Sequence, residues 1–309
     1  MPGGLKYSLI FTVLIVILFI SNLFFGSVSI PAQSVLDVLM GNSIEKQAWT
    51  YIIFDSRLPQ AITALFTGGA IAVSGLLLQT SFRNPLADPD ILGISAGANL
   101  GVALIVLLLG GSAGVVGSFD LSYSMSIVIG AFCGAALILA IIMAFATIIR
   151  NNIMLLIIGI MVGYLTSSVI SILKFWSTSE KAYSFMMWGM GDFSNVTLDQ
   201  LPFYCITLSV GLLLAILLIK PLNALLLGER YASNLGINIK ITRFLLLLCA
   251  GLLTATSCAF CGPIAFIGLA VPHISRLVLG TSNHKSLLPV TILAGSAMAL
   301  LCNLICILP

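Results

Sequence analysis

Long uninterrupted apolar runs constrain the fold of this chain more than any other feature. A helix needs about 20 apolar residues to cross a bilayer, and several separate runs of that length are present. Strands of a membrane barrel would alternate apolar and polar residues instead. The runs therefore predict a polytopic bundle of helices, which pair their own backbone groups in lipid. We expect nine spans, at 7–27, 59–81, 93–110, 122–149, 153–173, 201–219, 242–261, 264–280 and 288–308.

Composition supports an all-α integral membrane protein. The chain has 309 residues, of which 60% are hydrophobic and 7% charged, whereas soluble domains hold about 25% charged residues. We treat residues 1–309 as a single transmembrane domain and the first run as a retained helix, because no small-residue cleavage site follows it. The net charge of +3 is small and gives no reason to expect a nucleic-acid partner.

The distribution of basic residues predicts the orientation, because Lys and Arg near span ends stay in the cytoplasm. With the N-terminus inside, most of the basic residues fall in cytoplasmic segments and most of the acidic residues fall outside. The predicted cytoplasmic set is Lys6, Arg83, Arg150, Lys220, Arg230, Lys240, Arg243, Arg276 and Lys285, and the predicted outer set is Lys46, Arg57, Lys174 and Lys181.

The stretch RNPLADPDILGISAGANLG, residues 83–101, interrupts the apolar pattern. Pro85 and Pro89 cannot donate backbone hydrogen bonds and force a break in the helix. Glycines spaced four residues apart then give the next helix a bare face that allows close approach to a neighbour. Polar side chains at membrane depth tend to face a bundle interior or a cavity. Gln79, Ser95 and Asn99 are therefore candidates for a translocation pathway, although a tight turn with a packing face explains the same pattern.

Three further features are weighed on the residues alone. The segment Leu222–Gly236 has the pattern of one short amphipathic helix ended by Gly236, which suits a membrane-surface helix or a partner surface. Cys258 and Cys261 form a C-x-x-C inside an apolar run, and packing explains them better than metal or redox chemistry. His273 has no second ligand that could be placed with it, so we expect no metal site.

Three blocks of sequence carry a resemblance to a known family. They are RLPQAITALFTGGAIAVSGLLLQTSFRNPLADPDILGISAGANLG from Arg57, LLLGERYASNLGINI from Leu225 and GPIAFIGLAVPHISRLVLG from Gly262. The chain resembles the FecCD family, the membrane permeases of bacterial ABC importers for iron-siderophores, haem and cobalamin. The resemblance implies ten spans per subunit, a homodimer with the pathway at its interface, ATPase subunits and a substrate-binding protein. By that comparison we expect the tenth, C-terminal span to be missing from this chain.

The resemblance also implies an ATPase-coupling segment. In the family this cytoplasmic segment sits in a groove of the ATPase subunit. The positions of this chain that match the pattern are Gly228, Glu229, Ala232, Leu235 and Gly236.

Gate and docking residues follow from the same resemblance. The Asn-Pro-Leu turn implies a cytoplasmic gate at Asn84 and Leu86, and a second gate element is expected at Asn151 and Asn152. The family uses outer arginines to receive carboxylates of the binding protein, a role that falls on Arg57. Charge pairs of this kind mainly steer and orient docking.

Other function classes are weighed against the importer. The chain has no G-x-x-x-x-G-K-[ST] phosphate loop, so ATP hydrolysis requires a separate subunit and no cofactor is expected. An ion-coupled secondary transporter is the alternative, but it usually needs an ionisable group near the midplane, and every acid lies in a loop or at a span end. An intramembrane enzyme lacks a second carboxylate at membrane depth. We expect an iron-siderophore or related metal chelate as cargo, with haem and cobalamin behind, and a bacterial inner-membrane location.

Overall fold

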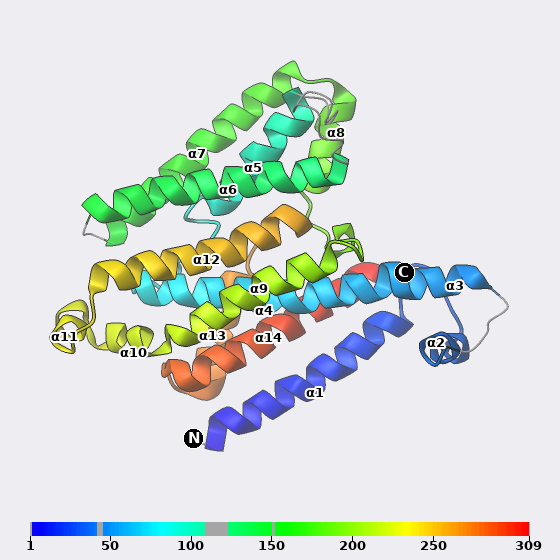
Figure 1. Ribbon diagram of the computed structural model, residues 1–309, viewed down its shortest axis with the longest axis horizontal. Helices are drawn as coiled ribbons and strands as arrows, with labels where there is room; N and C mark the ends of the chain where they lie inside the picture. The colour runs from blue at the N-terminus through cyan, green and yellow to red at the C-terminus, as the bar shows by residue number, and fades with distance from the viewer. Residues whose placement is uncertain (1, 42–45, 109–122, 150–151, 309) are drawn as a thin grey trace.

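The computed structural model describes residues 2–41, 46–108, 123–149 and 152–308, and every element in these ranges is a helix (Figure 1). In chain order the elements are α1 (Pro2–Phe24), α2 (Ala32–Leu39), α3 (Gln47–Tyr51), the π-helix η1 (Ile52–Arg57), α4 (Leu58–Phe82), α5 (Ile94–Ala103), the π-helix η2 (Leu104–Leu108), α6 (Tyr123–Ile148), α7 (Asn152–Trp176), α8 (Ser179–Trp188), the 3₁₀ helix η4 (Phe193–Asn195), α9 (Leu201–Leu217), α10 (Ile219–Leu227), α11 (Glu229–Asn234), α12 (Ile239–Cys261), α13 (Ile267–Leu279) and α14 (His284–Ile307).

The predicted membrane bundle is confirmed, and each of the nine predicted spans coincides with a helix. Six helices of the described residues are long and apolar enough to cross a membrane by themselves: α1, α3 to α4, α6, α7, α12 and α14. A seventh span forms if α9 and α10 count as one helix bent by 47°. The sixth predicted span, 201–219, therefore continues through this bend into α10. The start of the segment Leu222–Gly236, predicted to be a separate helix, belongs to α10.

The other two predicted spans are shorter helices, α5 with η2 and α13. Helix α13 has 13 residues, about 20 Å at 1.5 Å per residue, which is less than the roughly 30 Å of hydrocarbon. Each follows a non-helical segment, residues 83–93 and 262–266. Irregular backbone at membrane depth is tolerated where protein buries it, and Leu92 in the first segment is fully buried.

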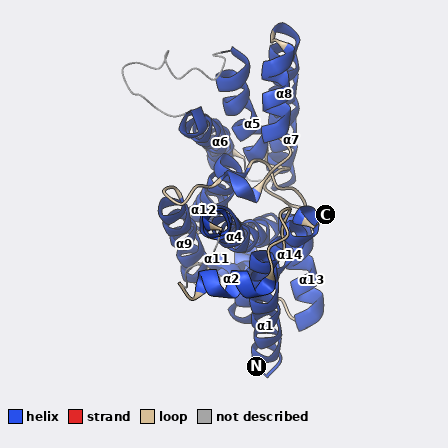
Figure 2. Ribbon diagram, turned by 90° about the vertical axis from the view of Figure 1, so that its right-hand side faces the viewer, coloured by secondary structure: helices blue, strands red, loops and turns tan. Residues whose placement is uncertain are grey.

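Helix α4 forms the centre of the molecule. It packs against α9, α12, α13 and α14, and 83% of its most apolar window is buried (Figures 1 and 2). Helices α5, α6 and α7 form a layer on one side that contacts the centre through α12, and α1 packs on α14 at the opposite side. Only 17% of the corresponding window of α1 is buried, as expected of a helix whose outer face meets lipid.

Small residues bring the helix backbones close together. A side chain at Gly97 or Gly101 of α5 would meet the backbone of Gly134 or Gly130 of α6. The predicted bare face of α5 is thereby confirmed, and its neighbour is α6. A side chain at Gly68 would likewise meet α14. Because no hydrophobic force drives helices together in lipid, such close contacts supply much of the association energy.

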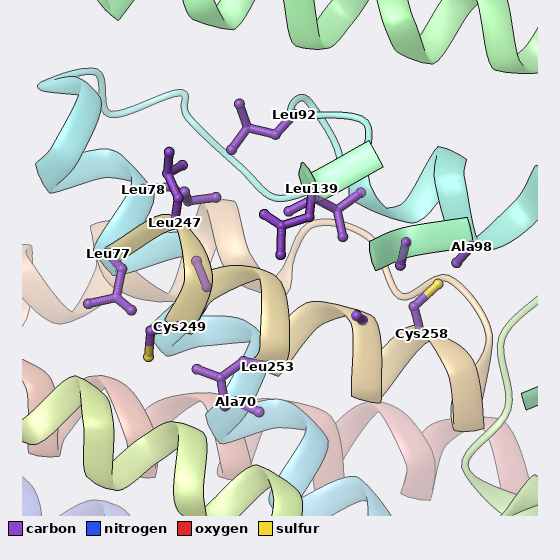
Figure 3. Packing of buried hydrophobic residues seen from close by; sticks show 14 of the residues in the cluster. Ala70, Leu77, Leu78, Leu92, Ala98, Leu139, Leu247, Cys249, Leu253 and Cys258 are labelled. Carbon is purple, nitrogen blue, oxygen red and sulfur yellow. The ribbon is translucent and has the colours of Figure 1, made fainter. Parts of the chain in front are cut away.

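The main core lies between these layers. Figure 3 shows Leu77 and Leu78 of α4, Leu247 and Leu253 of α12, and Leu139 of α6 gathered in one cluster. These side chains are buried, so α12 is the element that joins the α5–α7 layer to α4. The core therefore packs the C-terminal half of α4 against α12 and α6.

Candidate functional site

The predicted gate turn directly follows the last turn of α4. Arg83 has a left-handed backbone with φ of 50° and ends the helix. The Asn84 amide then donates to the Gln79 carbonyl at 3.1 Å, and the Asn84 side chain accepts from the Leu86 amide at 3.0 Å. Leu86 is 63% exposed. The turn is thus rigidly formed, with an apolar side chain at its tip.

Arg83 also joins the gate turn to the predicted coupling segment. Its Nη2 donates to the Leu225 carbonyl of α10 at 2.8 Å. The expectation of one continuous helix over Leu222–Gly236 is wrong, because the chain breaks between α10 and α11 at Gly228. The φ of 119° at Gly228 is a conformation that L side chains rarely adopt. The segment therefore consists of two short helices, of which α10 is tied to the end of α4.

A second tie from α4 passes through a buried histidine. The Asn223 side-chain oxygen of α10 accepts from the His284 backbone amide at 2.8 Å and lies 3.0 Å from His284 Nδ1. His284 Nε2 lies 3.0 Å from the Thr80 hydroxyl of α4. Because an amide oxygen only accepts, Nδ1 carries the proton of this contact. The chain of contacts joins α10, α14 and α4.

The third tie connects α4 to α13 at a proline. Pro272 has no amide proton, so the Gly268 carbonyl lacks its donor within α13. Gln79 Nε2 donates to the carbonyls of Gly268 at 3.3 Å and Leu269 at 3.2 Å, and its Oε1 accepts from Arg276 Nη1 at 2.6 Å. Gln79 thus satisfies the break in α13, and its pathway role stays a prediction.

The predicted coupling residues have different environments in α11 and its flanks. Glu229 forms an ion pair with Arg243 of α12 at 2.8 Å. Ala232 is fully buried, whereas Leu235 is 58% exposed. Helix α11 ends at Asn234 with Leu235 as its C-cap, and Gly236, predicted as the cap, follows one residue later with φ of 82°. Leu235 is therefore an exposed apolar side chain of the set, whereas Ala232 is buried and Glu229 is held by its ion pair.

Two of the predicted pathway residues lie on α5. The Ser95 hydroxyl donates to the Asp90 carboxylate, and the buried side-chain oxygen of Asn99 has no hydrogen-bond partner among the described residues. Among the described residues no hydrogen bond joins Ser95 or Asn99 to Gln79. The role of the three residues in a pathway stays a prediction.

The segment between Arg83 and Ile94 corrects one inference from the sequence. Asp88 belongs to a loop, yet its carboxylate is only 7% exposed and packs against Gly268 of α13. Gly268 in turn contacts Gly75 of α4 and lies near the Ile71 carbonyl, inside the bundle. Asp88 therefore lies in a loop, as the sequence indicated, but this loop is buried, so its place in a loop does not by itself count against an ion-coupled mechanism.

Arg57 occupies a structural position in this chain. It is 5% exposed, and its guanidinium donates to the carbonyls of Leu23 at 2.8 Å, Phe24 at 3.0 Å and Val28. These carbonyls lie at and just beyond the end of α1, where a helix leaves acceptors unpaired. A carboxylate of a second protein would compete with these bonds. The docking role of Arg57 stays a prediction, and its observed contacts are with α1.

The second predicted gate element is only partly described. Asn151 lies outside the described residues, and of Asn152 only its place at the start of α7 is described. Within the described ranges no group of three or more His, Cys, Asp or Glu side chains could hold a metal ion. His273 lies exposed on α13.

Sequence reasoning missed the exposed face of α7. Tyr164, Ser168 and Ser171 are exposed there and share one helix face by their spacing of four and three residues. The serine hydroxyls donate to carbonyls four residues earlier in the same helix. The signal was present as GYLTSSVIS within an apolar run, but it could be recognised only once α7 was seen at the edge of the bundle (Figure 1).

The fold describes a multi-span helical membrane protein. A search against family models matches residues 14–308 to the FecCD transport family. The chain therefore belongs to the FecCD family, whose members are transport permeases, and it is the membrane permease of an ABC importer of the inner membrane.

Named relatives agree with this assignment. The hemin transport system permease protein HmuU of Yersinia pestis is 33% identical over 97% of this chain and 87% of that protein. The molybdate import system permease protein MolB of Haemophilus influenzae is 32% identical, covering 94% and 84%. The vitamin B12 import system permease protein BtuC of Klebsiella pneumoniae is 38% identical, covering 80% and 72%.

A solved structure has the same fold. A metal-chelate type ABC transporter in an inward-facing conformation superposes with a TM-score of 0.83, at 30% identity over 97% of this chain and 90% of that one.

Proposed function

We propose that two copies of this permease import an iron-siderophore or a related metal chelate, with ATPase subunits bound at α10–α11 and a binding protein at the opposite end. The N-terminus and the α10–α11 end face the cytoplasm, as the distribution of basic residues favours. The observation that carries the proposal is the set of contacts at the last turn of α4, where three side chains tie it to surrounding helices.

These contacts give the coupling segment a route to the gate turn. Arg83 bonds α10, Thr80 reaches α10 through His284, and Gln79 bonds α13. Asn84 begins the turn directly after them. A displacement of α10 by an ATPase is therefore transmitted to α4 at the residues that precede the gate. Coupling of this kind needs an element with two arrangements that both sites bias, and we assign that role to the turn at Asn84 and Leu86.

An exposed apolar surface on α10–α11 supports the ATPase site. Leu227, Tyr231 and Leu235 are all more than half exposed at one end of the bundle. Exposed apolar patches commonly mark protein interfaces. Gly228 and Gly236 provide the turns that present this surface, and the Glu229–Arg243 pair fastens α11 to α12.

The exposed face of α7 supports a second copy and a pathway between the copies. Only 28% of its most apolar window is buried, and hydroxyl groups in hydrocarbon favour a neighbour or a water-filled cavity. The stripe of Tyr164, Ser168 and Ser171 carries no acid. The stripe is therefore better suited to an organic complex with exposed polar atoms than to a bare metal cation, because a bare cation prefers carboxylate ligands. Ser95 and Asn99 lie on α5, the helix that packs behind α7, and contribute to the pathway from there.

The ion-coupled alternative rests on one observation. Asp88 is a buried carboxylate whose Oδ1 has no hydrogen-bond partner among the described residues, and buried acids in membranes serve as ion or proton sites in some transporters. A requirement for ATP distinguishes the two mechanisms, because an ion-coupled carrier works without it.

Co-purification tests the proposal. The permease is expressed with the proteins encoded beside it and isolated in mild detergent, and bound proteins and ligand are identified by mass spectrometry. We expect an ATPase, a binding protein and a metal chelate. Ferric siderophore, hemin, cyanocobalamin and molybdate are then compared as cargo for the recovered binding protein. Recovery of the permease without an ATPase under conditions where it stays folded contradicts the proposal.

A further inference from the structure

A groove at the α10–α11 end of the molecule includes Asn84 of the gate turn in its lining, together with basic side chains for which the proposed function names no ligand. It has a volume of about 490 Å³ and lies between the last turn of α4, α10 and α13. Arg83, His273 and Arg276 line it, together with the exposed side chain of Leu226. The groove therefore places basic side chains of two separate helices around one opening.

The charges of the groove are unbalanced. Its lining contains two arginines and no aspartate or glutamate. Arg83 and Arg276 each hold one orienting bond, to the Leu225 carbonyl and to Gln79 Oε1, so their guanidinium groups are fixed in place. Within the described residues His273 makes no hydrogen bond and is exposed. Fixed guanidinium groups are well suited to bind phosphate oxygens through paired hydrogen bonds.

A second groove, which is apolar, also includes residues of α13 in its lining. It lies between α1, α13 and α14 and is lined by apolar side chains, among them Phe11, Leu18, Ile274 and Leu301. Ile274 follows His273 directly, so the two grooves share α13. The direction of α13 places Arg276 toward the end of α4 and Val271, which lines the apolar groove, farther into the bundle. Figure 2 shows α13 at the perimeter of the bundle beside α14 and α1.

We propose that these two grooves, on either side of the exposed face of α13, together bind an anionic phospholipid, with the headgroup phosphate at Arg83, His273 and Arg276 and an acyl chain along α13. Basic pockets between helices on the cytoplasmic side suit anionic headgroups. A soluble anion would use only the basic groove and leave the apolar one unexplained. An ATPase would meet Leu227, Tyr231 and Leu235, whereas Ile274 and Leu277 flank this site with exposed apolar side chains that suit lipid. The site is independent of the proposed cargo.

Lipid binding to the isolated permease tests the site. Delipidated full-length protein is titrated with phosphatidylglycerol or phosphatidylcholine in mixed micelles, and bound lipid is counted by native mass spectrometry. We expect phosphatidylglycerol to bind about tenfold more tightly than phosphatidylcholine, since each nearby basic residue attracts anionic lipid. His273→Glu places a negative charge in the groove without touching the Gln79 contacts and should abolish the preference. Arg276→Gln should reduce it, and Lys285→Gln, an exposed basic residue outside the groove, should leave it unchanged.

Two further experiments distinguish a lipid headgroup from free inorganic phosphate and from the ATPase as the occupant of the groove. Inorganic phosphate at millimolar concentration should not displace bound phosphatidylglycerol, because it gains nothing from the apolar groove. A photo-reactive amino acid at position 273 should form an adduct with lipid, with or without the ATPase subunit present. Equal binding of the two lipids by the wild-type protein, displacement by phosphate, or cross-linking to the ATPase in place of lipid would each overturn the proposal.

Discussion

Single glycines set the distances between helices in this permease. A Cβ at Gly268 would collide with the Asp88 carboxylate, and Gly75 contacts the Gly268 carbonyl across the α4–α13 interface. Gly163 of α7 is a glycine of the opposite kind, since a Cβ there would meet nothing within 4 Å. Close packing therefore requires a glycine at position 268, whereas the space around position 163 would accept a larger residue.

Gly268→Ala should therefore destabilise the permease, because overpacking forces α13 away from α4 at a typical cost of about 1–3 kcal/mol. Thermal unfolding in detergent, followed by size-exclusion fluorescence, measures the effect as a lower Tm. Gly163→Ala is the matched control and should leave the Tm unchanged. Equal melting of the two variants would show that α4 and α13 do not need this close contact.

Arg57 supports a second prediction at the residue scale. Arg57→Gln should lower the Tm of the isolated permease, because the end of α1 loses a charged donor to up to three carbonyls, and hydrogen bonds to charged groups contribute about 1.5–3 kcal/mol. Arg230→Gln, an exposed arginine of α11, is the control and should have no such effect. If Arg57→Gln melts like the wild type but loses binding-protein affinity at low ionic strength, the docking role holds and the structural role does not.

Residue types in the sequence predicted some of these roles and missed others. The two prolines after Arg83 predicted where α4 ends, because proline removes a donor wherever it stands. The roles of Gln79 and Arg57 could not be predicted, since both depend on carbonyls supplied by helices remote in sequence. The burial of Asp88 could not be predicted for the same reason, because its loop packs against α13 and depth is a tertiary property.

At the scale of elements, the last turn of α4 is where coupling segment, gate turn and α13 converge. The break at Gly228 makes α10 and α11 separate helices. Of the two, α10 is the one bonded to the end of α4, through Arg83 and through the contact of Asn223 with His284. Amphipathic spacing predicted a helical segment here. It could not place the break, because a glycine with positive φ and a glycine within a helix look alike in a sequence.

Removing the histidine tie should uncouple transport from ATP hydrolysis. We expect Thr80→Val to retain the ATPase on purification yet reduce cargo uptake severalfold, because the valine keeps the shape of threonine and removes the hydroxyl that faces His284. Thr80→Ser keeps the hydroxyl and should restore uptake. The measurement is the ratio of cargo transported to ATP hydrolysed. An unchanged ratio in Thr80→Val would exclude this route of coupling.

The exposed surface of α11 gives a prediction about assembly. Leu235→Asp should reduce co-purification of the ATPase by at least about tenfold, since a charge buried in an apolar interface costs more than 1.4 kcal/mol. Leu39→Asp changes an exposed leucine of α2, at the other end of the bundle (Figure 1), and serves as the control. Leu235 is a sharper probe than Glu229, because a change at Glu229 also breaks the pair with Arg243. Full recovery of the ATPase with Leu235→Asp would place the interface elsewhere.

At the scale of the whole molecule, the apolar runs were sufficient to predict the bundle, since lipid leaves few alternatives to helices. They were not sufficient to predict that two of the nine runs form short helices after buried irregular segments, or that α4 is the central helix. Hydropathy reports the length of an apolar run, whereas a place at the centre or the perimeter depends on which neighbours cover it. The exposed hydroxyls of α7 likewise indicate an interface or pathway only once α7 is known to lie at the edge of the bundle.

The central claim is that this chain moves its cargo by the action of an ATPase on the α10–α11 end. Its most direct test is uptake into proteoliposomes that contain the permease and its ATPase subunit, with the loaded binding protein outside and nucleotide inside. The account predicts uptake that requires ATP, stops when a non-hydrolysable analogue replaces it, and continues when a protonophore abolishes the proton gradient. Uptake that proceeds without ATP and collapses with the protonophore would contradict it and would assign the transport step to Asp88.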